Sequence, residues 1–223
     1  MLRGVIFDID GTLVASNEAH ARSWVETLSE AGYDVPFDVI WPMIGMGGDK
    51  LLPAATGIEA DSTLGKQLSD RRWEIFQSKF LPSLRPTDGA RALVEQIKSD
   101  GRMTIVATSA KGDELDALLD VAGVRELMDA TTSSSDAAES KPDPDIVQAA
   151  VRKSGFKPDE LIMLGDTPYD VEAAIGAHVN LIGMLCGGWT KEELSGATAI
   201  YENPADLLRW YDQSAFAVEA LAG

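Results

Sequence analysis

The chain has 223 residues, 45% of them hydrophobic, and a single cysteine, Cys186, so it can bury a substantial core but cannot form an intramolecular disulfide. With 19 basic against 36 acidic residues the net charge is −17, which disfavours nucleic acid and anionic membranes as partners. No stretch reaches the roughly 20 apolar residues of a membrane helix, and the chain opens on a strand pattern rather than a signal peptide, so we expect a cytoplasmic protein.

Four apolar runs have the length and continuity of buried strands, and helical patterns lie between them. The strands are expected at residues 4–7, 103–107, 161–164 and 179–184, and the helices at 89–98, 114–121 and 144–153. Runs without polar alternation, such as residues 161–164, are typical of strands covered on both faces. This order of elements predicts the α/β class with a doubly wound parallel sheet.

The stretch between about residues 15 and 85 breaks this alternation. It contains helical patterns at 18–31 and 63–80, with no convincing strand between them. Prolines and small residues border it on both sides, as is typical of linkers. We therefore expect an α/β core of residues 1–15 and 86–223, with residues 16–85 as an inserted helical domain.

Two further segments are assigned from their local pattern. Residues 131–135 form a short polar patch that predicts a loop, and residues 205–221 predict a closing helix.

Chemically active side chains gather at the expected strand ends and at one helix start, where an open parallel sheet binds its ligands. They are, in chain order, Asp8, Asp10, Thr108, Ser109, Lys141, Asp166 and Asp170. Carboxylates in one pocket repel each other, by roughly 4 kcal/mol for unit charges about 4 Å apart at an effective dielectric near 20. They require a cation, and all-oxygen ligands favour Mg²⁺.

Each of these motifs taken alone also has a purely structural explanation. Two aspartates two residues apart after a strand are typical of a turn closed by side-chain caps. Lys141-Pro142 is equally typical of a helix start that carries a surface lysine. The order of all the motifs together favours the functional interpretation.

Four motifs in this order resemble those of the haloacid dehalogenase-like (HAD) hydrolase superfamily. They are DIDGTL at residues 8–13, Thr108, Lys141-Pro142, and Gly165-Asp166 followed by Asp170. The insertion after the first motif resembles the small helical cap of the phosphoglycolate phosphatase and β-phosphoglucomutase branch. The resemblance implies a Rossmann-like core in which residues 16–85 form the cap domain.

The resemblance also implies catalytic roles for the motif residues. Asp8 would attack phosphorus and form an aspartyl-phosphate, and Asp10 would act as general acid and then general base. Lys141 and Thr108 would neutralise the phosphoryl oxygens in the transition state.

A magnesium site is implied at the same place. Asp8, the backbone carbonyl of Asp10, and Asp166 would be the ligands of Mg²⁺, and Asp170 would support them from outside the ligand shell.

Further residues are expected to contact the substrate: Gly11, Ser109, His20, Gly47, Gly48, Lys50 and Lys111. Residues 45–50 form a glycine-dense run that resembles the recognition loop of capped relatives, with a phosphate-binding nest as the alternative. His20 resembles a histidine near the hinge that approaches the acid/base aspartate, and the alternative is a half-buried histidine without a role. Lys111 would meet a second anionic group of the substrate.

The sequence thus predicts a Mg²⁺-dependent hydrolase of small phosphomonoesters, a phosphatase whose partner is a small phosphorylated metabolite. The alternative is a β-phosphoglucomutase-like sugar-phosphate mutase, although residues 45–49 lack the arginine of the run Lys-Gly-x-Ser-Arg found in that branch. A binding module that has lost catalysis is a third hypothesis, against which the intact acids argue. We expect a monomer or a weak homodimer.

Overall fold

The core is a parallel sheet whose strands run in the order β3-β2-β1-β4-β5-β6. The computed structural model describes residues 1–110 and 112–217. The strands are β1 (Gly4–Phe7), β2 (Met103–Ala107), β3 (Ala130–Thr132), β4 (Leu161–Gly165), β5 (Asn180–Met184) and β6 (Ala199–Tyr201). The expected α/β class with a doubly wound parallel sheet is confirmed.

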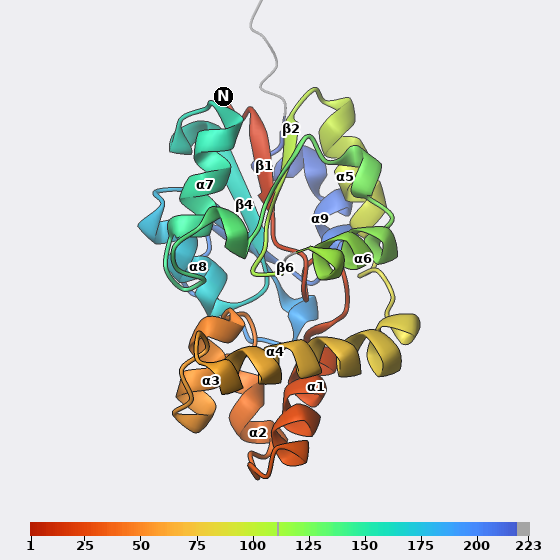
Figure 1. Cartoon of the computed structure of the whole chain (residues 1–223). Helices are drawn as coiled ribbons and strands as arrows, with labels where there is room; N and C mark the ends of the chain where they lie inside the picture. Colours follow the sequence, from red (N-terminus) through yellow and green to blue (C-terminus); the bar gives the residue numbers. More distant parts are fainter. Residues whose placement is uncertain (111, 218–223) are drawn as a thin grey trace, which may run out of the picture.

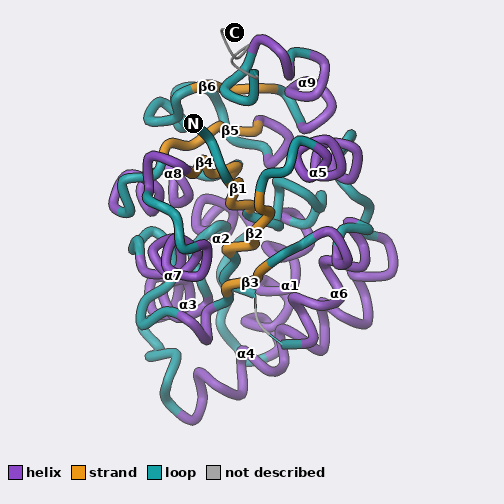
Figure 2. The backbone as a smooth tube through the Cα atoms, turned by 90° about the horizontal axis from the view of Figure 1, so that it is seen from above, coloured by secondary structure: helices purple, strands orange, loops and turns teal. Residues whose placement is uncertain are grey.

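Helices cover both faces of this sheet, as Figure 2 shows from above. The helices on one face are α5 (Ala90–Ser99), α6 (Asp113–Ala122) and α9 (Pro204–Arg209), and those on the other are α7 (Asp145–Ser154) and α8 (Pro168–Gly176). Successive side chains of a strand point to opposite faces. Accordingly, Val5 and Phe7 of β1 pack with α5 and α6, whereas Ile6 packs with α7 and α8.

Between β1 and α5 the chain forms a helical layer at the carboxyl edge of the sheet (Figure 1). Its helices are α1 (Asn17–Glu30), α2 (Phe37–Ile40), α3 (Gly48–Thr56) and α4 (Thr63–Ile75), and α4 continues as a π-helical turn over Phe76–Phe80. Trp24, Leu28, Leu51 and Leu68 belong to an apolar cluster of this layer alone. All of residues 16–85 are described, and no β-strand lies among them.

Two local expectations are corrected by the structure. Part of the expected loop at residues 131–135 is strand β3, which ends at Thr132, because these residues pair with β2 at the sheet edge. The expected closing helix ends early: α9 stops at Arg209, a short 3₁₀ turn follows at Tyr211–Gln213, and residues 218–221 of that expectation lie outside the described residues. Within the described part of the chain, no helix is long and apolar enough to cross a membrane.

Candidate active site

Neighbouring strands of the sheet end side by side and carry the predicted site residues into one crevice. β1 and β4 are in register, with Phe7 opposite Leu164, and the backbone N–H of Asp8 donates to the carbonyl oxygen of Leu164 at 2.9 Å. Thr108 and Asp166 follow the ends of β2 and β4 in the same way. The parallel register therefore brings these side chains to one edge of the sheet, opposite the helical layer.

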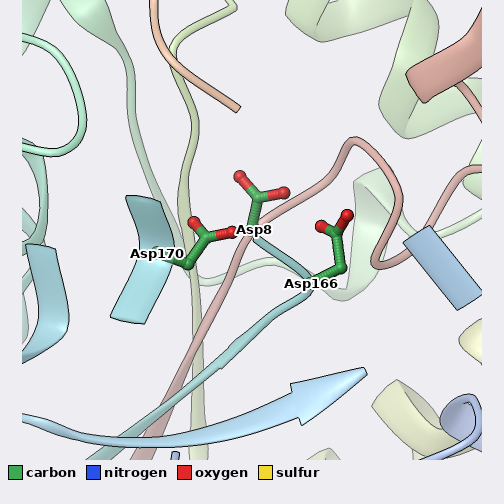
Figure 3. A group of neighbouring side chains, drawn as sticks. All are labelled: Asp8, Asp166 and Asp170. Atoms are coloured by element: carbon green, nitrogen blue, oxygen red, sulfur yellow. The ribbon is translucent and has the colours of Figure 1, made fainter. Parts of the chain in front are cut away.

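Three buried aspartates converge at this edge, and Figure 3 shows their carboxylates grouped together. One oxygen from each of Asp8, Asp166 and Asp170 lies within 4.8 Å of the others. Asp166 and Asp170 are at most 1% exposed and Asp8 is 6% exposed. Residues more than 150 positions apart in sequence thus form one cluster of negative charge inside the protein.

Lys141 compensates part of this charge from the loop that precedes α7. Its Nζ donates to Oδ1 of Asp8 at 2.5 Å and lies 2.6 Å from Oδ1 of Asp170. The other oxygen of Asp170 accepts from the backbone N–H and the hydroxyl of Thr167, which fixes the carboxylate. Burial disfavours the charged lysine, but Asp170 and Asp8 outweigh it and raise the pKa of Lys141 above its ordinary value.

One lysine cannot neutralise three carboxylates, and their pKa values reflect this imbalance. Burial, reinforced by the charges of Asp170 and Asp10, raises the pKa of Asp8 to about 8 despite the attraction of Lys141. Burial also raises the pKa of Asp166 well above its ordinary value, with Asp170 and Asp8 adding to the effect. Carboxylate oxygens are the ligands of hard cations, so this donor set fits a divalent metal ion that would stabilise the ionised acids.

Gly11, Thr12, Asn17 and Gly187 form a cradle around the carboxylate of Asp166. At the two glycines it leaves no room for a side chain. Oδ1 of Asp166 accepts from the hydroxyl of Thr12 at 3.0 Å, and its Oδ2 accepts from Nδ2 of Asn17 at 2.7 Å. A Cβ atom at Gly11 would lie 2.1 Å from Oδ2 of Asp166, and one at Gly187 would lie 1.8 Å from the same atom. Gly11 also has a φ of 74°, which favours glycine. Both positions therefore require glycine.

Asp10 lies apart from this cluster and is bound to the helical layer instead. Its Oδ1 accepts from the hydroxyl of Ser16 at 2.5 Å and lies 2.7 Å from Nε2 of His20. Burial alone would raise the pKa of Asp10, but His20, Ser16 and the charge of Arg72 together lower it below its ordinary value. The structure thus places His20 beside Asp10, and it holds Asp10 as a carboxylate.

The partners of His20 assign its tautomer. Nδ1 of His20 lies 3.2 Å from a guanidinium nitrogen of Arg72, and because arginine can only donate, Nδ1 accepts and Nε2–H donates to Asp10. Arg72, from α4, also makes two hydrogen bonds of 2.6 and 2.7 Å to the carboxylate of Glu114 on α6. A chain of contacts therefore runs from the core through the helical layer and back to Asp10.

Sequence reasoning missed Asn17, Arg72 and Glu114. Asn17 directly precedes the helix expected at residues 18–31, Arg72 lies on the helix expected at 63–80, and Glu114 begins the core helix expected at 114–121. No motif marks any of the three as functional. A polar residue at the border of the inserted segment, directly before its first expected helix, was the only available sign for Asn17, and no pattern in the sequence pointed to the other two.

The end of β2 supplies hydroxyl groups. Thr108 is 1% exposed, and its hydroxyl oxygen accepts from the backbone N–H of Ala110 at 3.1 Å, which leaves its O–H to donate. The hydroxyl of Ser109 is buried and has no hydrogen-bond partner among the described residues. Lys111, expected to meet a second anion, lies outside the described residues.

A cavity of about 460 Å³ lies between the sheet edge and the helical layer. The catalytic candidates Asp8, Asp10, Thr108 and Lys141 line its floor together with Ser109 and His20, and Gly47 and Gly48 line its other wall. Lys50, expected to bind substrate, is instead paired with acidic residues of the core. The cavity falls in the range of about 300–1,000 Å³ that is typical of sites for small molecules.

Comparison with known proteins assigns the chain to a family. Residues 5–184 match the haloacid dehalogenase-like hydrolase family. This match covers most of the chain and includes the strand ends at Asp8, Thr108 and Asp166 as well as Lys141. The protein therefore belongs to the haloacid dehalogenase-like hydrolases, and the resemblance seen in its motifs is confirmed.

Individual relatives agree with this family. The protein SUPPRESSOR OF QUENCHING 1, chloroplastic, of Arabidopsis thaliana is 31% identical over 187 residues, which span 81% of this chain but 17% of that protein. A phosphoglycolate phosphatase of Rhodospirillum rubrum is 29% identical over 94% of this chain and 91% of its own. The crystal structure of a hydrolase from Pseudomonas syringae superposes with a TM-score of 0.88 at 28% identity, covering 96% of this chain and 99% of that one.

Proposed function

We propose that this protein is a Mg²⁺-dependent phosphatase that hydrolyses small phosphomonoesters through an aspartyl-phosphate on Asp8. The observation that carries the proposal is the buried arrangement of Asp8, Lys141, Asp166 and Asp170, with Asp10 held separately by His20. The similarity over nearly the full length to a phosphoglycolate phosphatase supports the same class of reaction. The similarity supports the class of reaction, and we propose no particular substrate from it.

In the first step, a carboxylate oxygen of Asp8 attacks phosphorus, and the bond between phosphorus and the leaving oxygen breaks. Lys141 and the hydroxyl of Thr108 stabilise the phosphoryl oxygens as their charge shifts. Asp10 donates a proton to the departing alkoxide. The negative charge of a bound phosphate raises the pKa of a nearby carboxylate, so substrate binding favours the protonated form of Asp10 that this step needs.

In the second step, a water molecule attacks the phosphorus of the aspartyl-phosphate, and the bond to Asp8 breaks. Asp10, now ionised, accepts a proton from this water. Ser16 and His20 hold the carboxylate of Asp10 in place for both transfers. Two easier displacements thereby replace one difficult displacement.

The metal would be held by Asp8, Asp166 and the backbone carbonyl of Asp10, with Asp170 supporting them while it orients Lys141. When bound, Mg²⁺ supplies positive charge that offsets the carboxylates and the phosphate dianion. Thr12 and Asn17 keep Asp166 oriented toward the cluster.

Removal of divalent metal should abolish activity reversibly. Treating the protein with a chelator and dialysing it should lower the rate of phosphate release by at least about a hundred-fold, because the buried acids then lose their counter-charge. Adding Mg²⁺ should restore the rate, and adding Ca²⁺, which prefers more ligands and longer bonds, should not. A rate that survives exhaustive chelation would contradict the metal requirement.

A methyl group at Gly187 should displace Asp166 and weaken metal binding. The added Cβ of Gly187→Ala would overlap Oδ2 and Cγ of Asp166, which lie 1.8 and 2.4 Å from its position. We expect Mn²⁺ affinity, measured by electron paramagnetic resonance, to fall at least about ten-fold, as is typical when the support of a metal ligand is lost. Near-ultraviolet circular dichroism controls for folding, and an unchanged affinity in a folded variant would refute this role of the cradle.

Residues 16–85 are proposed to act as a cap domain over a core of residues 1–15 and 86–223. The separate apolar cluster of the helical layer and its position across the cavity support this division. A cap of this kind excludes bulk water and selects the leaving group. The expected ligand is a small phosphorylated metabolite whose leaving group fits the cavity.

A screen of phosphorylated metabolites tests the proposed function. The phosphatase should release phosphate from at least one small phosphomonoester in the presence of Mg²⁺. Formation of glucose 6-phosphate from β-glucose 1-phosphate with a bisphosphate primer, faster than phosphate release, would instead identify a mutase. Ligand binding without turnover of any compound would identify a binding module.

A further inference from the structure

The glycine-rich run of the helical layer contacts the loop that carries the catalytic lysine. Nζ of Lys50 lies 2.6 Å from Oδ2 of Asp143 and 3.0 Å from Oε2 of Glu139. The hydroxyl of Ser140 donates to Oδ1 of Asp49 at 2.6 Å, and its backbone N–H donates to Oδ2 of Asp49 at 3.4 Å. These partners lie within two residues of Lys141, before it and after it, so the run holds the loop on both sides of the lysine.

Positions 45 and 47 of this run require glycine because the backbone there lies against side chains of the core. A Cβ atom at Gly47 would lie 2.3 Å from the hydroxyl oxygen and 2.5 Å from Cβ of Ser140. At Gly45 it would lie 2.7 to 2.9 Å from the side-chain atoms of Thr167, and φ there is 107°. Gly45 and Gly47 therefore permit a close fit between the helical layer and the core.

Gly45 also contacts the residue that orients Asp170, the second carboxylate partner of Lys141. Thr167, which it contacts, donates its hydroxyl to Asp170 at 2.7 Å, and Asp170 lies 2.6 Å from Nζ of Lys141. One cap segment therefore contacts both the loop that carries Lys141 and the residue that fixes the carboxylate partner of this lysine.

We propose that Asp49 and Lys50 are positioning residues, which hold the loop of residues 139–143 and thereby place Lys141 against Asp8 when the cap is closed. This inference rests on the catalytic role of Lys141 in the proposed function. It gives the glycine-rich run a role other than substrate recognition. Individual partly exposed ion pairs contribute little, so the effect depends on the two ion pairs and the Ser140 contact acting on one loop.

Charge reversal at Lys50 tests this proposal. In Lys50→Glu, repulsion from Asp143 and Glu139 should release the loop and lower kcat on the order of ten-fold, with a smaller effect on KM. The charge swap Lys50→Glu with Asp143→Lys should recover most of this loss, because the first ion pair is rebuilt with opposite polarity. If Lys50 only stabilised the cap, Asp143→Lys would not restore kcat in the Lys50→Glu variant.

Lys79→Glu is the matched control. Lys79 forms an ion pair with Glu26 inside the helical layer and has a similarly flexible side chain, but its contact does not cross to the core. Its reversal should leave kcat unchanged. A fall in kcat as large as that of Lys50→Glu would show that any charge reversal in the cap has this effect, and would overturn the proposal.

A second measurement does not depend on turnover. Hydrogen–deuterium exchange of the backbone amides in residues 139–143 should accelerate at least about ten-fold in Lys50→Glu, as expected when a protected segment opens locally, and should slow again in the charge swap. If no substrate is ever turned over, the proposed function fails, but the exchange still tests whether Asp49 and Lys50 hold the loop of residues 139–143. Unchanged exchange in Lys50→Glu, or exchange that the charge swap does not slow, would overturn this positioning role even if the enzyme is active.

Discussion

Replacing Asp8 with asparagine should lower phosphatase activity on the order of a thousand-fold or more, as expected when a nucleophile is removed. Asparagine has nearly the same shape as aspartate, but its amide cannot form the acyl phosphate. Phosphate release measured with excess Mg²⁺ and saturating substrate checks the result. Activity within ten-fold of that of the unmodified protein would exclude Asp8 as nucleophile.

The same variant should remain folded, which separates chemistry from stability. Burial raises the pKa of Asp8 from 3.8 to about 8, so the metal-free protein loses stability as pH rises through this interval. Asparagine carries no charge and should remove that loss. Thermal unfolding of the metal-free proteins across this pH range should therefore show a flatter profile for Asp8→Asn, and a steeper profile would contradict the pKa of Asp8.

Replacing Lys141 with methionine should have the largest combined effect on activity and stability. Methionine fills a similar volume but leaves the buried acids without their lysine, which typically costs about 3–5 kcal/mol in the free energy of unfolding. Activity should also fall at least about a hundred-fold, because a fixed charge on the phosphoryl oxygens is lost. Denaturant unfolding and steady-state kinetics measure the two effects.

A second substitution distinguishes charge imbalance from lost packing. Asp170 is the other ion-pair partner of Lys141, so Lys141→Met combined with Asp170→Asn removes one of the uncompensated charges. The double variant should recover part of the stability but none of the activity. A double variant less stable than Lys141→Met alone would show that packing, and not charge, dominates at Lys141.

Much of the fold was predictable because long apolar runs specify buried strands. β1, β2, β4 and β5 were expected within one residue of their observed ends. β3 and β6 each have three residues at the sheet edges, too few to give a hydrophobic pattern of their own. They form because β2 and β5 present unpaired backbone groups beside them, and this is a property of the folded sheet.

The catalytic candidates could be predicted because each lies in a local motif, at a strand end or, for Lys141, before a helix. The structure brings Asp8, Asp166 and Asp170 together with Lys141, as the motifs imply, although their roles remain predictions. Contacts between the helical layer and the α/β core left no such local sign. The pairs Arg72–Glu114 and Asp49–Ser140 join segments 42 and 91 residues apart, and they exist only where two folded layers meet.

Identification of the phosphorylated residue during turnover tests the central claim most directly. The protein is mixed with a turned-over phosphomonoester and Mg²⁺, quenched in acid within the first turnovers, and digested for mass spectrometry. The mechanism predicts one acid-stable, base-labile phosphoryl group on the peptide that contains Asp8, at the carboxylate of Asp8. A phosphoryl group on another residue would contradict it. So would the absence of phosphorylated protein when Asp10→Asn, which blocks the second step, is given p-nitrophenyl phosphate, whose leaving group needs no proton from Asp10.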